Sequence, residues 1–231
     1  MPTQRCLDWT AIERSLVHDG HALVNDVLDP TRCGELRAGY TSDTFRSRVI
    51  MERHNYGRGE YQYYAYPLPP PIAQLRGNLY AELAPIANRW MEALKRPERF
   101  PLAQQEMLAL CAEYGQDRPT ALILKYGPGD FNALHQDLYG EVAFPFQLTF
   151  FLSEPEVDYT GGEFVLVEQR PRAQSRPEVI RPRRGAMLVF PNRYRPVVAK
   201  TSSYRTTFKH GVSTVHSGER YTLGIIFHDA K

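Results

Sequence analysis

A histidine and an aspartate stand two residues apart in the segment Leu134-His135-Gln136-Asp137. Residues i and i+2 of an extended segment point to the same side, so one imidazole and one carboxylate can meet the same metal ion. Two histidines and one carboxylate on one face of an octahedron leave three positions open. That arrangement suits a non-haem Fe(II) centre, which must also bind a bidentate cosubstrate and O₂. The pattern predicts a metal site that needs a second histidine from elsewhere in the chain.

Two histidines further along the chain could complete this site. His210 lies inside the β-prone run 206–212, whereas His216 lies where we expect a turn between two strands. The position within a strand favours His210 as the third ligand.

The predicted secondary structure changes from mainly helical to mainly β near residue 119. Before it, the apolar spacing and the capping residues predict helices at 8–17, from Pro30 onward, at 72–94 with a kink near Pro85, and at 103–114. A short strand is expected at 21–28. After it, short apolar and β-branched runs separated by turn residues predict strands at 121–125, 146–152, 163–168, 186–190, 206–212 and 221–227.

This order of elements predicts an α+β fold. We expect a double-stranded β-helix, or jelly-roll, core with N-terminal helices packed on it. No segment resembles a linker, so residues 1–231 are expected to form a single domain. Residues 1–118 would be a mainly helical support and substrate-lid region, and residues 119–231 the jelly-roll core with the metal site.

Composition places the chain among globular proteins without a membrane segment. Of its 231 residues, 42% are hydrophobic and 12% aromatic, enough to bury a core. No run of about eighteen apolar residues appears, and the N-terminus lacks the apolar stretch of an export signal. We therefore expect a cytoplasmic protein whose three separate cysteines, Cys6, Cys33 and Cys111, are reduced.

Charge is distributed unevenly along the chain. The formal net charge is +2, yet the segment 170–209 holds eleven lysines and arginines against one acid, Glu178. Such asymmetry favours a basic face and a polyanionic partner.

Around the predicted metal ligands the chain resembles the 2-oxoglutarate/Fe(II)-dependent oxygenase superfamily. His210 precedes Arg220 by ten residues, and the turn Thr160-Gly161-Gly162 resembles the prolyl-hydroxylase branch at the matching place. The resemblance implies Fe(II) and 2-oxoglutarate as cofactors. It also implies that Arg220 pairs with the far carboxylate of 2-oxoglutarate, a task that suits a forked guanidinium. The ten-residue spacing again favours His210 over His216.

The segment that begins at Tyr126 resembles AlkB-type nucleic-acid demethylases. In that group a tyrosine nine residues before the first histidine contacts the cosubstrate, which implies this role for Tyr126. Two positions depart from the AlkB pattern. Leu124 stands where AlkB has a cosubstrate-binding asparagine, and Ile226 stands where it has a second arginine.

Nearly the whole chain resembles a bacterial family of oxygenases associated with damaged DNA. Segments 45–49, 57–61, 66–70, 84–90 and 223–229 carry this resemblance. It implies oxidative demethylation of alkylated bases in DNA repair, with single-stranded or flipped-base DNA as partner. Arginine and tyrosine side chains would then hold phosphates and bases. The candidates are Arg46, Arg48, Arg58, Tyr61, Tyr64, Arg193 and Arg195. The alternative is a prolyl-type protein hydroxylase or a small-molecule hydroxylase with the same iron chemistry.

Overall fold

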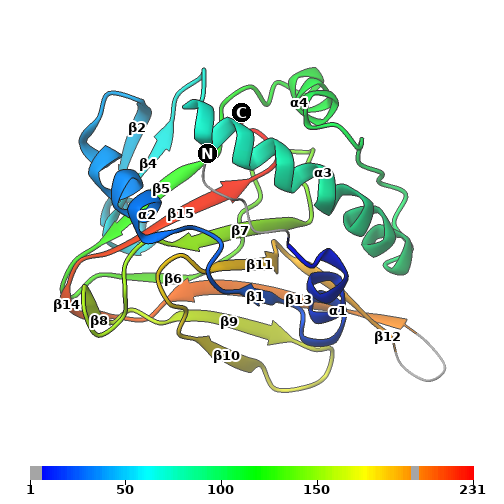
Figure 1. Cartoon of the computed structure of the whole chain (residues 1–231). Helices are drawn as coiled ribbons and strands as arrows, with labels where there is room; N and C mark the ends of the chain where they lie inside the picture. Colours follow the sequence, from blue (N-terminus) through cyan, green and yellow to red (C-terminus); the bar gives the residue numbers. More distant parts are fainter. Residues whose placement is uncertain (1–6, 199–202) are drawn as a thin grey trace.

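The structure is a computed structural model and describes residues 7–198 and 203–231 (Figure 1). Cys6 and part of the basic segment 170–209 lie outside the described residues. The helices are α1 (Trp9–Asp19), α2 (Pro30–Ala38), α3 (Pro70–Ala93) and α4 (Gln104–Glu113), with 3-10 turns η1 (Gly39–Thr41) and η2 (Met51–His54). The strands are β1 (Ala22–Val24), β2 (Phe45–Ile50), β3 (Gly57–Arg58), β4 (Glu60–Tyr64), β5 (Leu122–Tyr126), β6 (Phe131–His135), β7 (Phe146–Phe151), β8 (Tyr159–Gly161), β9 (Phe164–Gln169), β10 (Arg176–Ile180), β11 (Met187–Pro191), β12 (Tyr194–Val198), β13 (Ser203–Val212), β14 (Val215–Gly218) and β15 (Arg220–Ile226).

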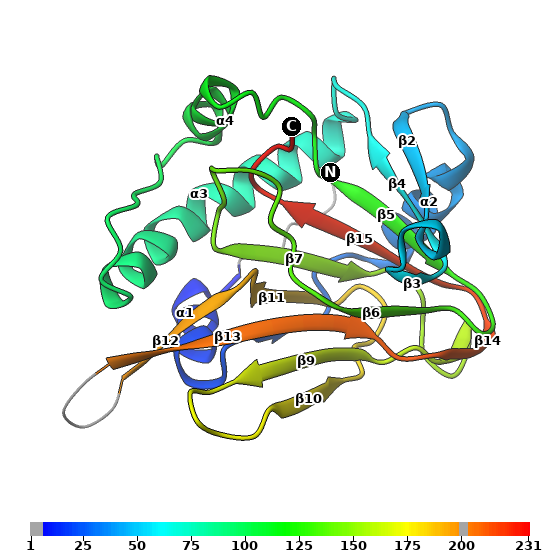
Figure 2. The same ribbon diagram turned by 180° about the vertical axis from the view of Figure 1, so that it is seen from behind.

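Two antiparallel sheets form the body of the molecule. The larger has the strand order β1-β11-β7-β15-β5-β4-β2, and the smaller has the order β10-β9-β13-β6-β3, with β12 paired to β13. Figure 2 brings β6, β13, β9 and β10 to the front of the view. From β5 to β15 the chain crosses repeatedly between the two sheets, so segments distant in sequence become neighbours. The expectation of a mixed helix and sheet fold is confirmed.

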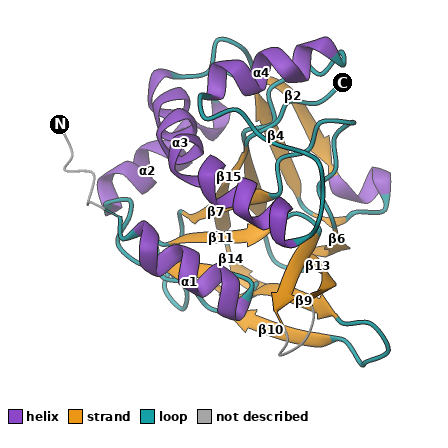
Figure 3. Ribbon diagram, turned by 90° about the vertical axis from the view of Figure 1, so that its right-hand side faces the viewer, coloured by secondary structure: helices purple, strands orange, loops and turns teal. Residues whose placement is uncertain are grey.

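The central strands β7, β11 and β15 of the larger sheet are buried on both faces, and their side chains alternate between two environments. On β7, Phe146, Leu148 and Phe150 join the main core with the helices, whereas Gln147 and Thr149 face the opposite way and line a cavity. This is the two-residue period of a strand. Figure 3 shows α1, α2 and α3 along one side of the strands. A second core, which includes Phe164 and Phe208 of the smaller sheet and Leu188 of the larger, fills part of the space between the sheets.

The helices begin where the sequence predicts. The Asp8 carboxylate accepts the Ala11 amide at the start of α1, and Asp29 accepts the Arg32 amide at the start of α2, where Pro30 holds the first position. Both contacts satisfy backbone donors that a helix leaves unpaired. Helix α3 continues through Pro85.

The strands differ from the expectation at several places. All six runs expected after residue 119 form strands, but β8, β10, β12 and β14 were not anticipated. Arginine and proline obscure the pattern of β10 and β12, and β8 and β14 are short. Three strands of the larger sheet, β1, β2 and β4, come from the first 118 residues, so the sheet is continuous across the division near 119. No helix among the described residues is long and apolar enough to cross a membrane. Cys33 and Cys111 are buried free thiols.

Candidate active site

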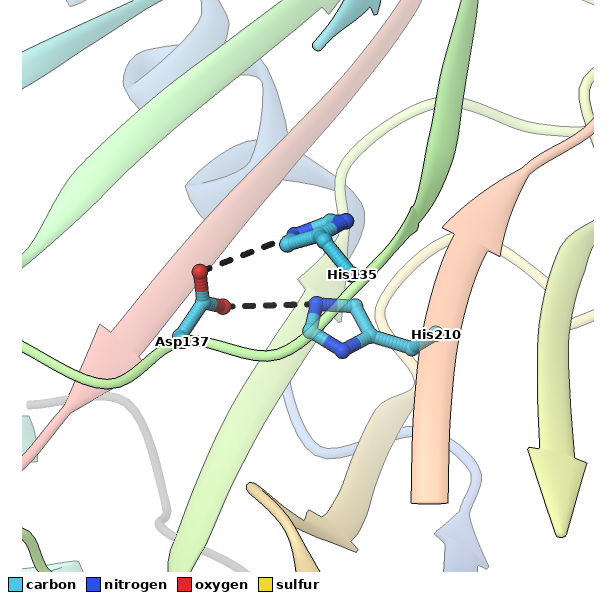
Figure 4. A group of neighbouring side chains, drawn as sticks. All are labelled: His135, Asp137 and His210. Atoms are coloured by element: carbon cyan, nitrogen blue, oxygen red, sulfur yellow. Dashed lines mark ion pairs between the residues drawn. The ribbon is translucent and has the colours of Figure 1, made fainter. Parts of the chain in front are cut away.

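His135, Asp137 and His210 come together although they lie on different elements (Figure 4). His135 ends β6 and stands opposite His210 on β13 as its antiparallel partner, with the two ring centres 4.1 Å apart. Asp137 follows β6 and reaches both rings, with Oδ1 3.6 Å from His135 Nε2 and Oδ2 3.3 Å from His210 Nε2. One ligand atom from each residue lies within 4.8 Å of the others, and no other such group occurs among the described residues.

The two histidines are oriented by contacts on their other faces. His135 Nδ1 lies 2.7 Å from the carbonyl of Ala133, so Nδ1 carries the proton and Nε2 stays free. His210 is buried between Phe164, with which its ring stacks at 5.9 Å, and Phe190 at 4.9 Å. Both histidines therefore direct Nε2 toward Asp137.

The ionisation states also fit a metal site. Burial lowers the pKa of His210, and the neighbouring His135 acts in the same direction. Burial alone would raise the pKa of Asp137, but the hydrogen bonds and charges of its neighbours, led by His210, outweigh it and hold that pKa well below its ordinary value. Two neutral imidazoles and a carboxylate are the donor set that non-haem Fe(II) takes.

Arg220 lies in the same cavity of about 460 Å³ as the three candidate ligands. Its side chain is 1% exposed, and none of its three guanidinium nitrogens has a hydrogen-bond partner among the described residues. The rings of Tyr126, Phe151 and Tyr159 surround it with centres 5.4 to 5.9 Å from the guanidinium carbon. A buried cation without an acid is costly, so this position fits an anionic ligand such as a carboxylate of 2-oxoglutarate.

Tyr126 lies beside this cation. It is fully buried in the cavity wall, and Asn132 Nδ2 donates to its hydroxyl at 3.3 Å. Burial raises the pKa of Tyr126 to about 12, so its hydroxyl remains a proton donor at neutral pH. The structure thus brings Tyr126, Arg220 and the three candidate ligands into one cavity.

The glycines of the Thr160-Gly161-Gly162 turn have a steric role at this end of the cavity. Gly162 has a φ of +62°, and a Cβ there would lie 2.9 Å from Arg220 Cδ. A Cβ on Gly161 would lie 2.4 Å from the carbonyl oxygen of Thr214. The turn therefore needs residues without side chains to let β14 and Arg220 pack against it.

His216 does not lie in a turn, as the sequence predicted, but on the short strand β14, where it is exposed. Strand β14 pairs with β8 rather than with the sheets that carry the cavity. The two histidines therefore occupy different surroundings, His210 in the cavity and His216 on the surface.

Among the residues expected to contact substrate, Tyr61 lines the cavity and Arg58 is not one of its lining residues. Arg58 is on β3, which pairs with β6 next to Phe131. Its guanidinium is largely exposed and its nearest acid, Glu52, is 3.9 Å away. Tyr56, which belongs to the same arginine- and tyrosine-rich stretch of the sequence, also lines the cavity, is 51% exposed and stacks on His54 at 5.4 Å.

Two arginines on β2 have partners on the protein itself. Arg46 donates to the carbonyl of Pro119 and lies 4.6 Å above the ring of Tyr63. Arg48 forms an ion pair with Glu60.

Three further candidates lie away from the cavity. Tyr64 points to the helix side of β4, where it stacks on Phe45 at 4.5 Å, because adjacent residues of a strand face opposite ways. Arg195 is buried against Glu168 at 2.9 Å. Arg193 lies over the ring of Tyr194 and borders a separate cavity. The structure therefore does not place these three side chains at the metal site.

The basic segment 170–209 is partly neutralised by its neighbours. Arg170 and Arg195 both contact Glu168, at 3.2 and 2.9 Å, and Arg181 lies 3.0 Å from Glu163. Glu168 on β9 and Glu163 just before it thus offset three of the arginines in this basic segment.

Tyr139 is a site residue that sequence reasoning missed. Its hydroxyl donates to Asp137 Oδ1 at 2.8 Å, and its own oxygen accepts a hydrogen bond from Tyr63 at 3.2 Å. The sequence signal was its place two residues after Asp137, on the same side of an extended segment.

Comparison with known proteins agrees with this site. The family model Oxygenase-NA, described as "Oxygenase, catalysing oxidative methylation of damaged DNA", matches residues 59–230. An uncharacterised protein of Mycobacterium tuberculosis is 52% identical over 164 residues, which cover 71% of this chain and 70% of that protein.

Solved structures share the fold at low sequence identity. A prolyl-4-hydroxylase of Pseudomonas putida superposes with a TM-score of 0.58 at 15% identity, covering 96% of this chain and 99% of its own. A prolyl hydroxylase of Trichoplax adhaerens, solved with a hypoxia-inducible-factor peptide, gives 0.61 at 15% identity, covering 96% and 89%. The donor set and the unpaired Arg220 fit Fe(II) and 2-oxoglutarate. The chain therefore belongs to the Oxygenase-NA family and is an enzyme of the 2-oxoglutarate/Fe(II)-dependent oxygenase class.

Proposed function

We propose that this enzyme removes alkyl groups oxidatively from bases in DNA. In this proposal His135, Asp137 and His210 hold Fe(II), and Arg220, assisted by Tyr126, binds the far carboxylate of 2-oxoglutarate. The observation that carries it is the buried Arg220 guanidinium, which has no hydrogen-bond partner among the described residues and lies in the same cavity as the three candidate ligands. The bound iron, with 2-oxoglutarate and O₂, supplies the oxidant, and the protein supplies position and exclusion of water.

The strand order supports assigning the core as a double-stranded β-helix. In chain order, β5, β7, β11 and β15 belong to the larger sheet, and β6, β9, β10 and β13 to the smaller. Eight strands distributed in this way over two facing sheets are the arrangement of a jelly-roll. We assign residues 1–231 to one domain, in which residues 1–118 add helices and extra strands to that core.

The products follow from hydroxylation of an N-methyl group. One oxygen atom of O₂ enters the methyl C–H bond and the other enters 2-oxoglutarate, which becomes succinate and CO₂. The hydroxymethyl group then leaves the nitrogen as formaldehyde, and the base regains its N–H. Hydroxylation of a carbon that is not bound to nitrogen, as in a prolyl side chain, would release no formaldehyde.

Two observations support a nucleic-acid substrate over a peptide. The family description names damaged DNA. Tyr56, which lines the cavity, offers with its neighbour His54 an exposed aromatic surface, and Arg58 on the adjoining strand β3 offers an exposed cation whose ion pair with Glu52 is long, at 3.9 Å. Aromatic stacking and a phosphate-binding arginine are what extracting a base from its stack requires.

The test is a turnover assay with Fe(II) and 2-oxoglutarate on methylated single-stranded oligonucleotides and on proline-containing peptides, with succinate and formaldehyde both measured. We expect equal amounts of the two products on methylated DNA. His210→Ala should abolish turnover, and His216→Ala, the same change at an exposed histidine, should retain it. Succinate without formaldehyde, formed only with peptide, would establish the hydroxylase alternative instead.

A further inference from the structure

Of the three candidate ligands, Asp137 is the one that strand pairing does not hold in place. His135 and His210 lie on paired strands, so the backbone ladder fixes the positions of their Cα atoms. Asp137 lies beyond the end of β6, in the connection to β7, where no strand pairing holds it. The direction of its carboxylate therefore depends on side-chain contacts.

Tyr139 provides the shortest of these contacts. Its hydroxyl lies 2.8 Å from Asp137 Oδ1, while Oδ2 faces His210 Nε2 at 3.3 Å. An ionised carboxylate can only accept hydrogen bonds, so Tyr139 is the donor. With its proton directed at Asp137, the hydroxyl oxygen of Tyr139 is free to accept from Tyr63, whose hydroxyl lies 3.2 Å away.

Packing holds the two tyrosine rings in place. The ring of Tyr63 meets that of Tyr139 edge-on at 6.4 Å, and Arg46 covers Tyr63 at 4.6 Å while donating to the carbonyl of Pro119. On its other side, Tyr139 packs at 6.1 Å from the buried ring of His228. The hydrogen-bonded pair is thus anchored on the larger sheet, because Tyr63 belongs to β4.

We propose that Tyr139 is a positioning residue for the metal site. It holds Oδ1 of Asp137 so that Oδ2 is presented beside the two histidine nitrogens, and Tyr63 holds Tyr139. The inference rests on the metal ligands proposed above and not on the choice of substrate. Removal of a residue that orients a metal ligand weakens metal affinity by about 10- to 100-fold, which is the loss expected for Tyr139→Phe.

The experiment measures Mn(II) affinity of the full chain from the electron paramagnetic resonance signal of the free ion. Tyr139→Phe removes one oxygen atom and leaves the ring, and Tyr56→Phe makes the same change at a cavity tyrosine without a contact to Asp137. We expect about 10- to 100-fold weaker binding in Tyr139→Phe, and unchanged affinity in Tyr56→Phe. Thermal unfolding without metal checks that both variants are folded.

The double variant Tyr63→Phe/Tyr139→Phe tests whether Tyr63 acts through Tyr139. If it does, Tyr63→Phe alone weakens binding less than Tyr139→Phe, and the double variant binds Mn(II) as Tyr139→Phe does. Additive losses would exclude the link through Tyr139. Affinity unchanged in Tyr139→Phe would overturn the positioning role, whereas no Mn(II) binding by the unaltered chain would overturn the metal site itself. Should Tyr139→Phe fail to fold, a loss in Tyr63→Phe supports the proposal and its absence contradicts it.

Discussion

Arg220 and Tyr126 stand opposite each other on β15 and β5, with the guanidinium carbon 5.4 Å from the centre of the phenol ring. The ring attracts the cation but accepts none of the hydrogen bonds that its N–H groups can donate. Arg220 is thus buried in contact with aromatic rings while its donors remain available to a ligand.

This relationship predicts an unusual effect on stability. Arg220→Met is expected to raise the free energy of unfolding of the ligand-free protein by about 1–3 kcal/mol, because an unpaired buried polar group is removed. The same variant should lose the stabilisation that 2-oxoglutarate and metal give the unaltered protein. Urea unfolding with and without 2-oxoglutarate and Mn(II) measures both effects.

The matched control is Arg76, which is equally buried at 1% exposure but has partners. It donates to Asp229 at 2.8 Å and to the carbonyl of Ile226 at 2.9 Å. Arg76→Met leaves Asp229 as an uncompensated buried charge and should destabilise the protein by about 3–5 kcal/mol. Equal destabilisation by the two substitutions would show that Arg220 has a partner within the protein.

Gly162 is expected to control the affinity for 2-oxoglutarate without touching it. Gly162→Ala places a Cβ 2.9 Å from Arg220 Cδ, so the arginine must shift and the KM for 2-oxoglutarate should rise about tenfold or more, a cost of about 1.4 kcal/mol. Gly115→Ala is the control, because Gly115 also has a positive φ, +71°, but open space around it. Both variants should lose about 1–2 kcal/mol of stability, and a similar rise of KM in both would contradict a specific role of Gly162.

His228 predicts how stability depends on pH. Burial, reinforced by Arg76, lowers the pKa of His228 to about 3, and its Nδ1 accepts the Phe144 amide. The unfolded chain binds a proton at this histidine below about pH 6.5, whereas the folded chain does not until about pH 3. As the pH is lowered through this interval, the free energy of unfolding should therefore decrease by about 1.4 kcal/mol per pH unit through His228 alone.

Unfolding of the ligand-free protein between pH 7 and 4 tests this dependence. His228→Asn keeps an acceptor for the Phe144 amide but cannot take up a proton in this range. The free energy of unfolding of this variant should depend less steeply on pH than that of the unaltered protein, by about 1.4 kcal/mol per pH unit. Parallel profiles would mean that His228 is protonated in the folded state.

Arg58 should contribute to the salt dependence of DNA binding. An arginine that contacts phosphate releases a counterion, so Arg58→Ala should weaken binding uniformly and reduce the slope of log affinity against log salt by about 1. Arg48→Ala should leave the slope unchanged, because Arg48 is paired with Glu60. Fluorescence anisotropy with a single-stranded oligonucleotide at several salt concentrations gives both slopes, and absence of binding at low salt would exclude the DNA proposal.

The residue pattern predicted the candidate metal ligands, and the family resemblance implied Arg220 and Tyr126 beside them. His135 and Asp137 share one side of an extended segment, whereas the ten-residue spacing of His210 and Arg220, which lie on β13 and β15 with β14 between them, gained its meaning from the family resemblance. Side chains along β4 alternate between the two faces of the sheet, so Tyr64 faces the opposite way from Tyr61 and away from the cavity. This alternation could have been read from the sequence.

Long-range contacts were beyond such patterns. Arg195 was expected to contact substrate, but it is buried against Glu168, which comes from another strand and whose position depends on sheet register. Tyr139 depends in the same way on Tyr63 from β4, 76 residues away in sequence. That no described residue forms a hydrogen bond with the Arg220 guanidinium is likewise visible only when the surrounding elements are in place.

The pairing of His135 with His210 across β6 and β13 has a consequence for metal exchange. Both residues are held by backbone pairing between strands, so we expect folding and metal loading to be separate events, unlike in small domains that fold only around zinc. A chelator should therefore remove the ion reversibly while the circular dichroism of the strands stays unchanged. The enzyme can in this way lose its iron and be reloaded as an intact protein, so that its activity follows the supply of the metal.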